Sequence, residues 1–212
     1  MSNVVIRTIE EKDIPAIKAA INDVWCFSDL ISDDKRLDAT IGLYLNQILY
    51  DVTYGKVAML DEKVVGVILG SIHDELPTCR HLLEDATTHA ITMLGAPEAE
   101  RQGVYEYLTK QKEVYEQLSS GLFGEYDGSL DFLVLTSEAQ GLGVGKKLWL
   151  ELKAHFEGKG VNSIYLYSDA DCNTGFYEHQ GFSCRKEKEV VYDFDGEISK
   201  VMNYLYDIKL GE

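Results

Sequence analysis

A glycine-rich run, Gln140-Gly141-Leu142-Gly143-Val144-Gly145-Lys146, is the part of the sequence best suited to bind an anion. Glycines let main-chain amides approach a ligand without interference from a Cβ atom, and the first amides of a following helix carry a partial positive charge. The run therefore predicts a site for a phosphate-bearing ligand. A tight turn that binds nothing is the alternative, because a glycine motif alone is weak evidence.

Two common phosphate-binding motifs do not fit this run. The P-loop requires glycine at position 140 and Ser or Thr at position 147, where Gln140 and Lys147 stand. The dinucleotide-binding fingerprint requires glycine at position 146, where Lys146 stands. If the run binds phosphate, it must do so in another structural setting.

The elements around the glycine run are predicted to be a strand, a helix and a second strand. Residues 130–136 are nearly all apolar, as expected for a strand that is covered on both faces. The helix predicted over 142–158 has apolar residues at helical spacing, namely Leu148, Trp149, Leu152 and Phe156. With a strand over 161–168, these elements form a βαβ unit, in which the two strands run parallel.

Patterning predicts the remaining elements as well. The predicted strands cover 4–9, 56–60, 64–72, 182–192 and 200–209, and the last two form a hairpin around Asp195-Gly196. The predicted helices cover 10–24, 34–52, 98–118 and 173–179.

A second segment, Asn173 to Phe182 (NTGFYEHQGF), strengthens the interpretation of the glycine run. Together with the pattern Gln-x-x-Gly-x-Gly at 140–145, it strongly resembles two motifs of the GNAT superfamily of N-acetyltransferases, with Tyr177 and Gly181-Phe182 in place. The resemblance covers about 1–73 and 128–210. One departure is Ser137, since the family often has proline three residues before the Gln of this pattern.

The resemblance implies a fold of the α/β (α+β) class. It would be a GNAT-like mixed, mostly antiparallel, twisted sheet of about seven strands flanked by helices. Residues 1–212 would form a single domain, with 74–127 as a helical insertion between the third and fourth strands. This insertion is expected either to cap the substrate side or to form a dimer surface. The parallel strands 130–136 and 161–168 are expected to splay rather than to pair along their full length.

The resemblance also implies an activity and a binding site for its cosubstrate. An acetyl group would pass from acetyl-CoA directly to a primary amine of a small cationic molecule or a peptide. The amides from Gln140 to Lys146 would hold the diphosphate, and the strand edge at Leu133, Leu135 and Thr136 would pair with the pantetheine arm. The amide near Leu135 would stabilise the oxyanion. Asn173 would contact the cofactor or serve only as a helix cap. No metal is expected.

Two side chains are the candidate catalytic groups. Tyr177 would be the general acid for the departing thiolate, and its hydroxyl would have to be hydrogen-bonded to act; a core tyrosine is the alternative. Asp131 is a candidate base, since it lies on the strand that precedes the glycine run. Other carboxylates and imidazoles remain open as the base, namely Glu75, Glu125, Asp127, His73 and His81.

The charge and hydropathy of the chain limit the classes of partner that we expect. The 212 residues carry 36 acidic and 20 basic side chains, for a net charge of −16. We therefore expect no nucleic-acid partner, and we expect cations to be attracted. Without an apolar run of membrane-spanning length or an export leader, we expect a cytoplasmic protein with no membrane partner. Its four cysteines are then expected to be free reduced thiols, and Cys172 a passive one. The alternative function is a catalytically weak acyl-CoA-binding or interaction module with the same fold.

Overall fold

The computed structural model describes residues 4–122, 124–139, 141–194 and 196–211. Its centre is a seven-stranded sheet in the order β1-β2-β3-β4-β5-β7-β6. The strands are β1 (Val4–Thr8), β2 (Tyr54–Leu60), β3 (Lys63–Ile72), β4 (Gly128–Leu135), β5 (Ser163–Asp169), β6 (Ser183–Phe194) and β7 (Glu197–Lys209). All neighbouring strands are antiparallel except β4 and β5. The predicted fold class is therefore confirmed.

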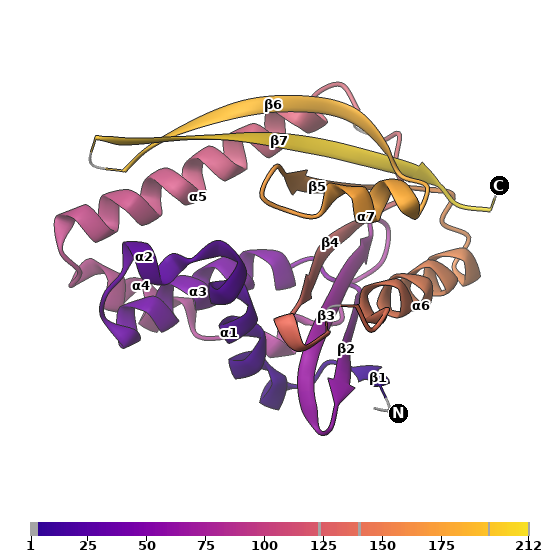
Figure 1. Ribbon diagram of the computed structural model, residues 1–212, viewed down its shortest axis with the longest axis horizontal. Helices are drawn as coiled ribbons and strands as arrows, with labels where there is room; N and C mark the ends of the chain where they lie inside the picture. Colours follow the sequence, from indigo (N-terminus) through magenta and orange to yellow (C-terminus); the bar gives the residue numbers. More distant parts are fainter. Residues whose placement is uncertain (1–3, 123, 140, 195, 212) are drawn as a thin grey trace.

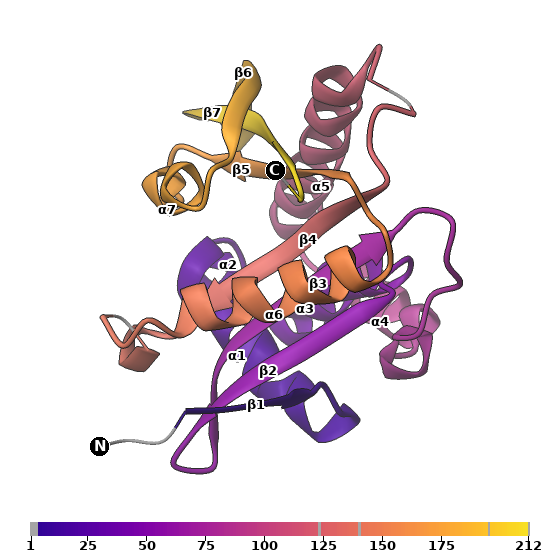
Figure 2. The ribbon, with the colours of Figure 1, turned by 90° about the vertical axis from the view of Figure 1, so that its right-hand side faces the viewer.

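Helices cover both faces of the sheet (Figures 1 and 2). They are α1 (Ile14–Trp25), α2 (Phe27–Leu30), α3 (Asp34–Leu49), α4 (Ala86–Leu94), α5 (Glu98–Ser119), α6 (Val144–Gly158) and α7 (Thr174–His179). Short 3₁₀ turns lie at Glu11–Asp13, Arg80–Leu82 and Ser137–Ala139. Sequence patterning did not predict α2 or α4 as separate helices, and both are short.

Local sequence explains several element boundaries. The Asp33 side chain accepts hydrogen bonds from the amides of Lys35 and Arg36 at 3.1 and 3.0 Å, so it caps the start of α3. Between β2 and β3, Asp61 and Glu62 have φ values of 47° and 67°. Positive φ at both central residues is typical of the type I′ turn, whose twist matches that of a hairpin.

The core is divided by the sheet. On one face, α1 and α3 bury apolar side chains against β2, β3 and β4. On the other face, α6 buries Leu148, Trp149, Leu152 and Phe156. A third cluster joins α5 to the β6–β7 hairpin through Val114, Leu118 and Leu205. The sheet and α6 thus fix the position of the glycine run, and α5 fixes the hairpin.

Candidate active site

The parallel strands β4 and β5 separate soon after they begin. They pair only at Gly128 with Ile164 and at Ser129 with Tyr165. Beyond that point the two strands run in clearly different directions (Figure 1). The predicted splay is therefore confirmed, and it leaves the edge of β4 free of strand partners from residue 130 onward.

The free edge of β4 presents backbone groups toward β5. The Thr136 amide donates to Val65 O on the β3 side at 3.0 Å. Because successive residues of a strand direct their hydrogen-bonding groups to opposite edges, the amides of Leu135 and Leu133 point toward the open side. These two residues have the orientation that pairing with an extended, amide-containing ligand requires. The amide of Thr136, by contrast, is already used within the sheet.

Asp131 lies at a β-bulge. Leu69 pairs with Phe132 and Gly70 with Leu130, so Asp131 has no partner on β3. Its carboxylate accepts a hydrogen bond from Ser129 Oγ at 2.5 Å and another from Ser71 Oγ. The residue is exposed to solvent, although many protein atoms surround its carboxylate. Burial raises the pKa of Asp131 to about 6, although both serine hydrogen bonds favour the ionised form.

The glycine run forms an open turn at the start of α6. Gly141 and Gly143 have φ values of 74° and 69°, and a Cβ atom added at either would meet nothing within 4 Å. Gly145 instead lets the helix approach β4, since a Cβ there would lie 3.1 Å from Leu135 Cδ1. Gln140 lies outside the described residues.

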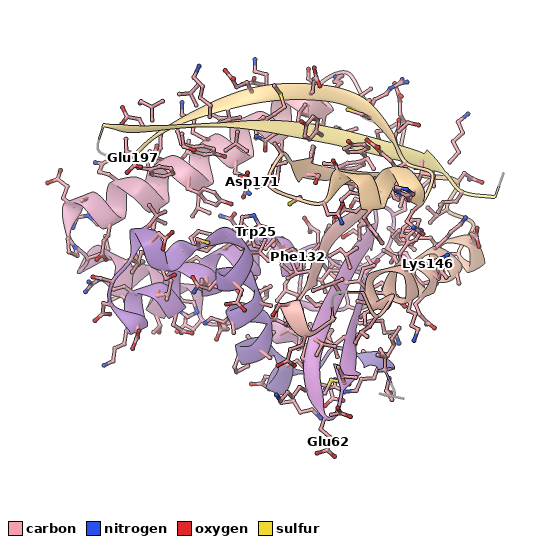
Figure 3. The ribbon with its side chains drawn as sticks, in the orientation of Figure 1. Trp25, Glu62, Phe132, Lys146, Asp171 and Glu197 are labelled. Carbon is pink, nitrogen blue, oxygen red and sulfur yellow. The ribbon has the colours of Figure 1, made fainter. Side chains whose placement is uncertain are left out.

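The first amides of α6 are not used by the helix. The first backbone bond of the i to i−4 kind runs from the Lys147 amide to Gly143 O at 3.1 Å. The amides of Val144, Gly145 and Lys146 precede it, and in the described part of the chain no side chain caps this end. Leu142 and Lys146 are exposed beside the turn, and Lys146 is labelled in Figure 3. The turn therefore offers free donors, space and a cation, which fits a diphosphate.

A second observation on the same side of the sheet concerns Ser168 of β5. Its hydroxyl is buried and has no hydrogen-bond partner among the described residues. Ser168 lies two positions from Leu166, which packs in the α6 cluster, so both side chains are on the α6 face. An unpaired buried hydroxyl on this face fits a polar ligand that would lie between β4 and β5.

Tyr177 lies in α7, packed among other rings. Its ring is edge-on to Phe176 and Phe182, with centroids 5.4 and 5.9 Å away. Burial raises the pKa of the phenol, and the nearby Cys172 and Asp169 add to this effect. No hydrogen bond joins its hydroxyl to another described residue, so the expectation that Tyr177 is hydrogen-bonded is not met in this structure. The phenol remains protonated at neutral pH, as a general acid must.

Two other predictions about this segment are tested by the structure. Asn173 precedes α7, but its side chain makes no capping hydrogen bond and is exposed, so the predicted cap is wrong. The side chain is therefore free to contact a ligand. Cys172 is a poor nucleophile, as predicted, because burial first and Asp169 second raise the pKa of its thiol to about 12.

The remaining candidate bases have structural partners. Glu75 pairs with Lys159 at 2.8 Å, and Glu125 lies 3.6 Å from Arg185. Asp127 accepts the amides of Asn162 and Ser163 at 2.7 and 3.1 Å, which ties together the paired ends of β4 and β5. The rings of His73 and His81 each contact a backbone carbonyl through Nδ1. Of the predicted bases, Asp131 alone is a carboxylate on the splayed strand β4 that is held by two hydroxyl groups, those of Ser129 on β4 and Ser71 on β3.

The structure also contains a hollow that sequence reasoning missed. It has a volume of about 400 Å³ and lies between the α1–α2 junction, α5, the β5–α7 connection and the β6–β7 hairpin. Trp25, Tyr107 and Tyr192 line it together with Asp169 and Asp171. These residues are far apart in sequence, so no local pattern brings them together. In Figure 3, Trp25 and Asp171 lie across from each other near the centre of the molecule.

Neither a membrane span nor a metal cluster is found among the residues that the structure describes. No described helix is both long and apolar enough to cross a bilayer. No group of three or more His, Cys, Asp or Glu side chains in the described ranges is arranged to hold a metal ion.

The model of the Acetyltransferase (GNAT) family matches residues 109–182, which include the glycine run and the Tyr177 segment. No curated protein matches the sequence.

Several solved structures are similar over nearly the whole chain. An N-acetyltransferase from Staphylococcus aureus Mu50 is 15% identical, with a TM-score of 0.54, and the match covers 98% of this chain and 99% of that one. A ribosomal-protein-alanine N-acetyltransferase from Brucella melitensis is 17% identical, with a TM-score of 0.54 and coverage of 97% and 99%. The yncA protein of Salmonella typhimurium, solved with its cofactor acetyl-CoA, is 14% identical, with a TM-score of 0.54 and coverage of 99% and 95%. At these identities the likeness shows the fold.

Proposed function

We propose that this chain is a GNAT-family acetyltransferase that transfers an acetyl group from acetyl-CoA to a primary amine by direct attack, a proposal that the match of the family model to residues 109–182 supports. The observation that carries the proposal is the splay of β4 and β5 beyond Ser129. It opens the sheet between the glycine run on one strand and the Tyr177 segment on the other. A thioester in this opening would be reached from both sides.

Acetyl-CoA fits the backbone groups of the glycine turn and of the free β4 edge. The amides of Gly141 and of 143–146 would hold its diphosphate, with the exposed Lys146 supplying positive charge in an acidic protein. The Leu142 amide, which was also predicted to bind the cofactor, already donates to Ala139 O at 3.3 Å. The Leu133 and Leu135 amides would pair with the pantetheine arm as an added strand does. Acetyl-CoA supplies an activated acetyl thioester when bound. Every other contribution must come from the protein.

The transfer step requires one acid and one base. The amine nitrogen attacks the carbonyl carbon, so that a C–N bond forms and the C–S bond breaks. The Leu135 amide is oriented to donate to the oxyanion, an interaction of about 3 kcal/mol when pre-organised. The Tyr177 hydroxyl gives its proton to the departing sulfur. Asp131 takes the proton that the amine loses through intervening water, because four residues of extended strand, about 13 Å, separate it from Leu135.

The net charge favours a cationic acceptor. A charge of −16 attracts an ammonium group and repels anions everywhere except at a local cationic site. The proposed acceptor is therefore an amine that is protonated in solution, either on a small molecule or at a peptide end. It must lose its proton before it can attack, which gives a carboxylate with a pKa of about 6 a role as the base.

One observation favours a second candidate function. The Tyr177 hydroxyl lacks a hydrogen bond to any described residue that would position it. A chain that binds acyl-CoA and has lost catalysis would show the same feature. The two functions differ in turnover, since only the enzyme releases free thiol when an amine is added.

The test is thiol release from acetyl-CoA with a panel of polyamines, aminoglycosides, amino acids, arylalkylamines and peptides. Release with at least one amine, and loss of release in Tyr177→Phe at unchanged CoA affinity, is the expected result. Calorimetric titration with CoA is the companion measurement. CoA binding without any turnover would favour the second function, and absence of CoA binding would overturn both.

A further inference from the structure

The hollow beside α5 differs from the proposed cofactor side in its chemistry. One wall is aromatic, and its rings pack against one another in a continuous row. Phe27 meets Tyr107 edge-on at 5.3 Å, Tyr107 stacks on Tyr192 at 5.8 Å, and Tyr192 stacks on Phe194 at 5.7 Å between ring centroids. All four residues line the hollow, with Trp25 at its edge. Such a wall binds an apolar or aromatic group and attracts a cation over the ring faces.

The lining of the hollow is also acidic. Asp29, Asp169 and Asp171 line it, and no Lys or Arg is among its described lining residues. The Asp169 carboxylate is held in place, because its Oδ1 accepts the amides of Asp171 and Cys172 at 3.0 and 3.1 Å. Carboxylates and aromatic rings that line the same hollow favour a positively charged group attached to an apolar body.

One end of the hollow lies at the β5–α7 connection. Asp169, the last residue of β5, lines it together with Cys172, and the chain then enters α7, which carries Tyr177. Trp25, which also lines the hollow, stacks on Phe132 of β4, with ring centroids 5.6 Å apart. The hollow therefore borders both of the strands that splay apart.

Helix α5 forms part of this wall. It contributes Tyr107 and Gln111, and the Gln111 side-chain amide donates to the Tyr107 hydroxyl at 3.2 Å. Farther along, Val114 and Leu118 of the same helix are buried against the β6–β7 hairpin, so the wall is fixed by packing on both sides. The volume of about 400 Å³ lies in the range of small-molecule sites.

We infer that this hollow is the acceptor site and that it takes a small amine with an aromatic or other apolar body, whose ammonium group lies at Asp169. The inference rests on the proposed function and adds the substrate class to it. The 98–119 helix then acts as the specificity wall, which favours a small molecule over an extended peptide.

The experiment compares 2-phenylethylamine with butylamine, 2-phenylethanol, spermidine and an alanyl tripeptide. Binding is measured by calorimetry on the protein saturated with CoA, and turnover by thiol release from acetyl-CoA. The expected order places 2-phenylethylamine first in both assays, with no binding of the neutral alcohol. Tighter binding of spermidine or of the tripeptide would overturn the assigned substrate class.

Substitutions of residues that line the hollow, each paired with a control elsewhere, test whether the amine binds there. Asp169→Asn keeps the acceptor oxygen of the carboxylate and is expected to raise the amine KM about tenfold, whereas Asp74→Asn, an exposed carboxylate elsewhere, should leave it unchanged. Tyr107→Ala should lower the preference for 2-phenylethylamine over butylamine about fivefold, unlike Tyr105→Ala, which removes an exposed ring of the same helix. If Tyr107→Ala does not fold, Phe194→Ala tests the same wall from the hairpin.

The outcomes separate this inference from the proposed function. Amine binding that Asp169→Asn and the wall variants weaken, without any turnover, would support the site and reject the transferase. Turnover with an amine KM that these variants leave unchanged would support the transferase and overturn the site.

Discussion

The Ser129 hydroxyl donates a hydrogen bond to Asp131 Oδ1 at 2.5 Å. Ser129 is the last residue of β4 that pairs with β5, and Asp131 is the first carboxylate beyond it. Ser71 supplies a second hydroxyl to the same carboxylate. Burial raises the pKa of Asp131 to about 6, and the two serines oppose that rise. The pKa of the proposed base is therefore raised by burial first and by the charge of Asp51, and lowered by the two serine hydrogen bonds.

The pH dependence of turnover follows from this balance. A base must be unprotonated, so kcat/KM is expected to rise with pH through a midpoint of about 6. Ser129→Ala removes a hydrogen bond that favours the ionised form, so the midpoint should move to higher pH. Asp131→Asn should abolish this limb and lower kcat about 100-fold. A limb that keeps its midpoint in both variants would exclude Asp131 as the base.

Tyr177→Phe tests the general acid. The phenol is partly buried and has no hydrogen bond to another described residue, so its removal should leave the free energy of unfolding nearly unchanged. We expect kcat to fall about 100-fold while the CoA dissociation constant stays within about twofold. The matched control is Tyr206→Phe, whose ring centroid lies 6.3 Å away and whose hydroxyl contacts Glu178. Equal losses in both variants would point to packing rather than to acid catalysis.

Gly143→Ala tests the proposed diphosphate site. A side chain at φ 69° costs about 1 kcal/mol, although no atom lies within 4 Å to clash with it. Alanine keeps the main-chain amide, but its Cβ would occupy the open space in which the diphosphate would lie, so the CoA dissociation constant should rise roughly tenfold. Gly160→Ala is the matched control at the other end of α6, where φ is 77° and space is again open. It should cost similar stability and leave CoA binding intact, as calorimetry would show.

The glycine run and the order of strands were predictable because their signals are local. Apolar periodicity and glycine positions depend on neighbours in sequence, and they set α6 and the strand before it. The orientation of Asp131 was not predictable in this way. Simple alternation would place residues 130, 132 and 134 on one face. The bulge shifts the pattern, so that Leu130 packs on the α6 side and Phe132 and Val134 pack on the α1 and α3 side.

The acceptor hollow was not predictable for a different reason. Trp25, Tyr107, Asp169 and Tyr192 come from four separate elements, and each alone resembles an ordinary surface or core residue. Only the packing of α5 on the hairpin brings them together. Residues 74–127 stood out in sequence through their acidity and helical periodicity, but nothing in that pattern identified Tyr107 as a pocket residue.

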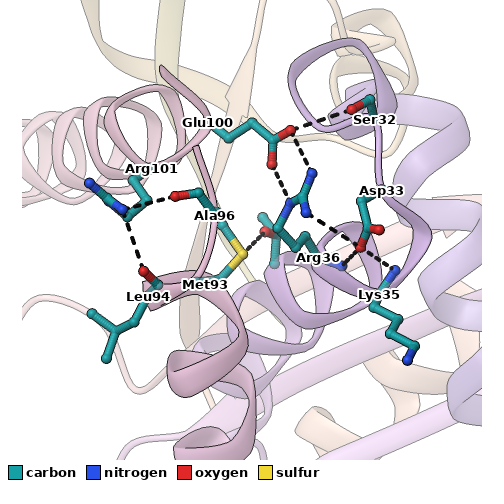
Figure 4. A network of polar contacts seen from close by, with 10 residues as sticks. Ser32, Asp33, Lys35, Arg36, Met93, Leu94, Ala96, Glu100 and Arg101 are labelled. Carbon is teal, nitrogen blue, oxygen red and sulfur yellow. Dashed lines mark hydrogen bonds and ion pairs between the residues drawn. The ribbon is translucent and has the colours of Figure 1, made fainter. Parts of the chain in front are cut away.

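The attachment of α5 to α3 gives the last prediction. Arg36 Nε lies 2.6 Å from Glu100 Oε2, and a second guanidinium nitrogen lies 3.1 Å from Oε1, as Figure 4 shows. The Arg36 hydrogen bond holds the pKa of Glu100 below its usual value. A carboxyl whose pKa is lowered by folding stabilises the fold above its unfolded pKa of about 4.3, and that stability is lost as pH falls through the folded pKa.

Glu100→Gln is therefore expected to lower the free energy of unfolding at pH 7, and the difference from the unmodified protein should shrink toward pH 3. Urea unfolding at both pH values measures this. Glu98→Gln, at an exposed position in the first turn of the same helix, is the control and should change stability little at either pH. A Glu100→Gln loss of the same size at pH 3 and pH 7 would mean that shape rather than charge joins the helices. Because α5 carries Tyr107, the same variant should also raise the amine KM more than Glu98→Gln does, if the helix forms the wall of the acceptor site.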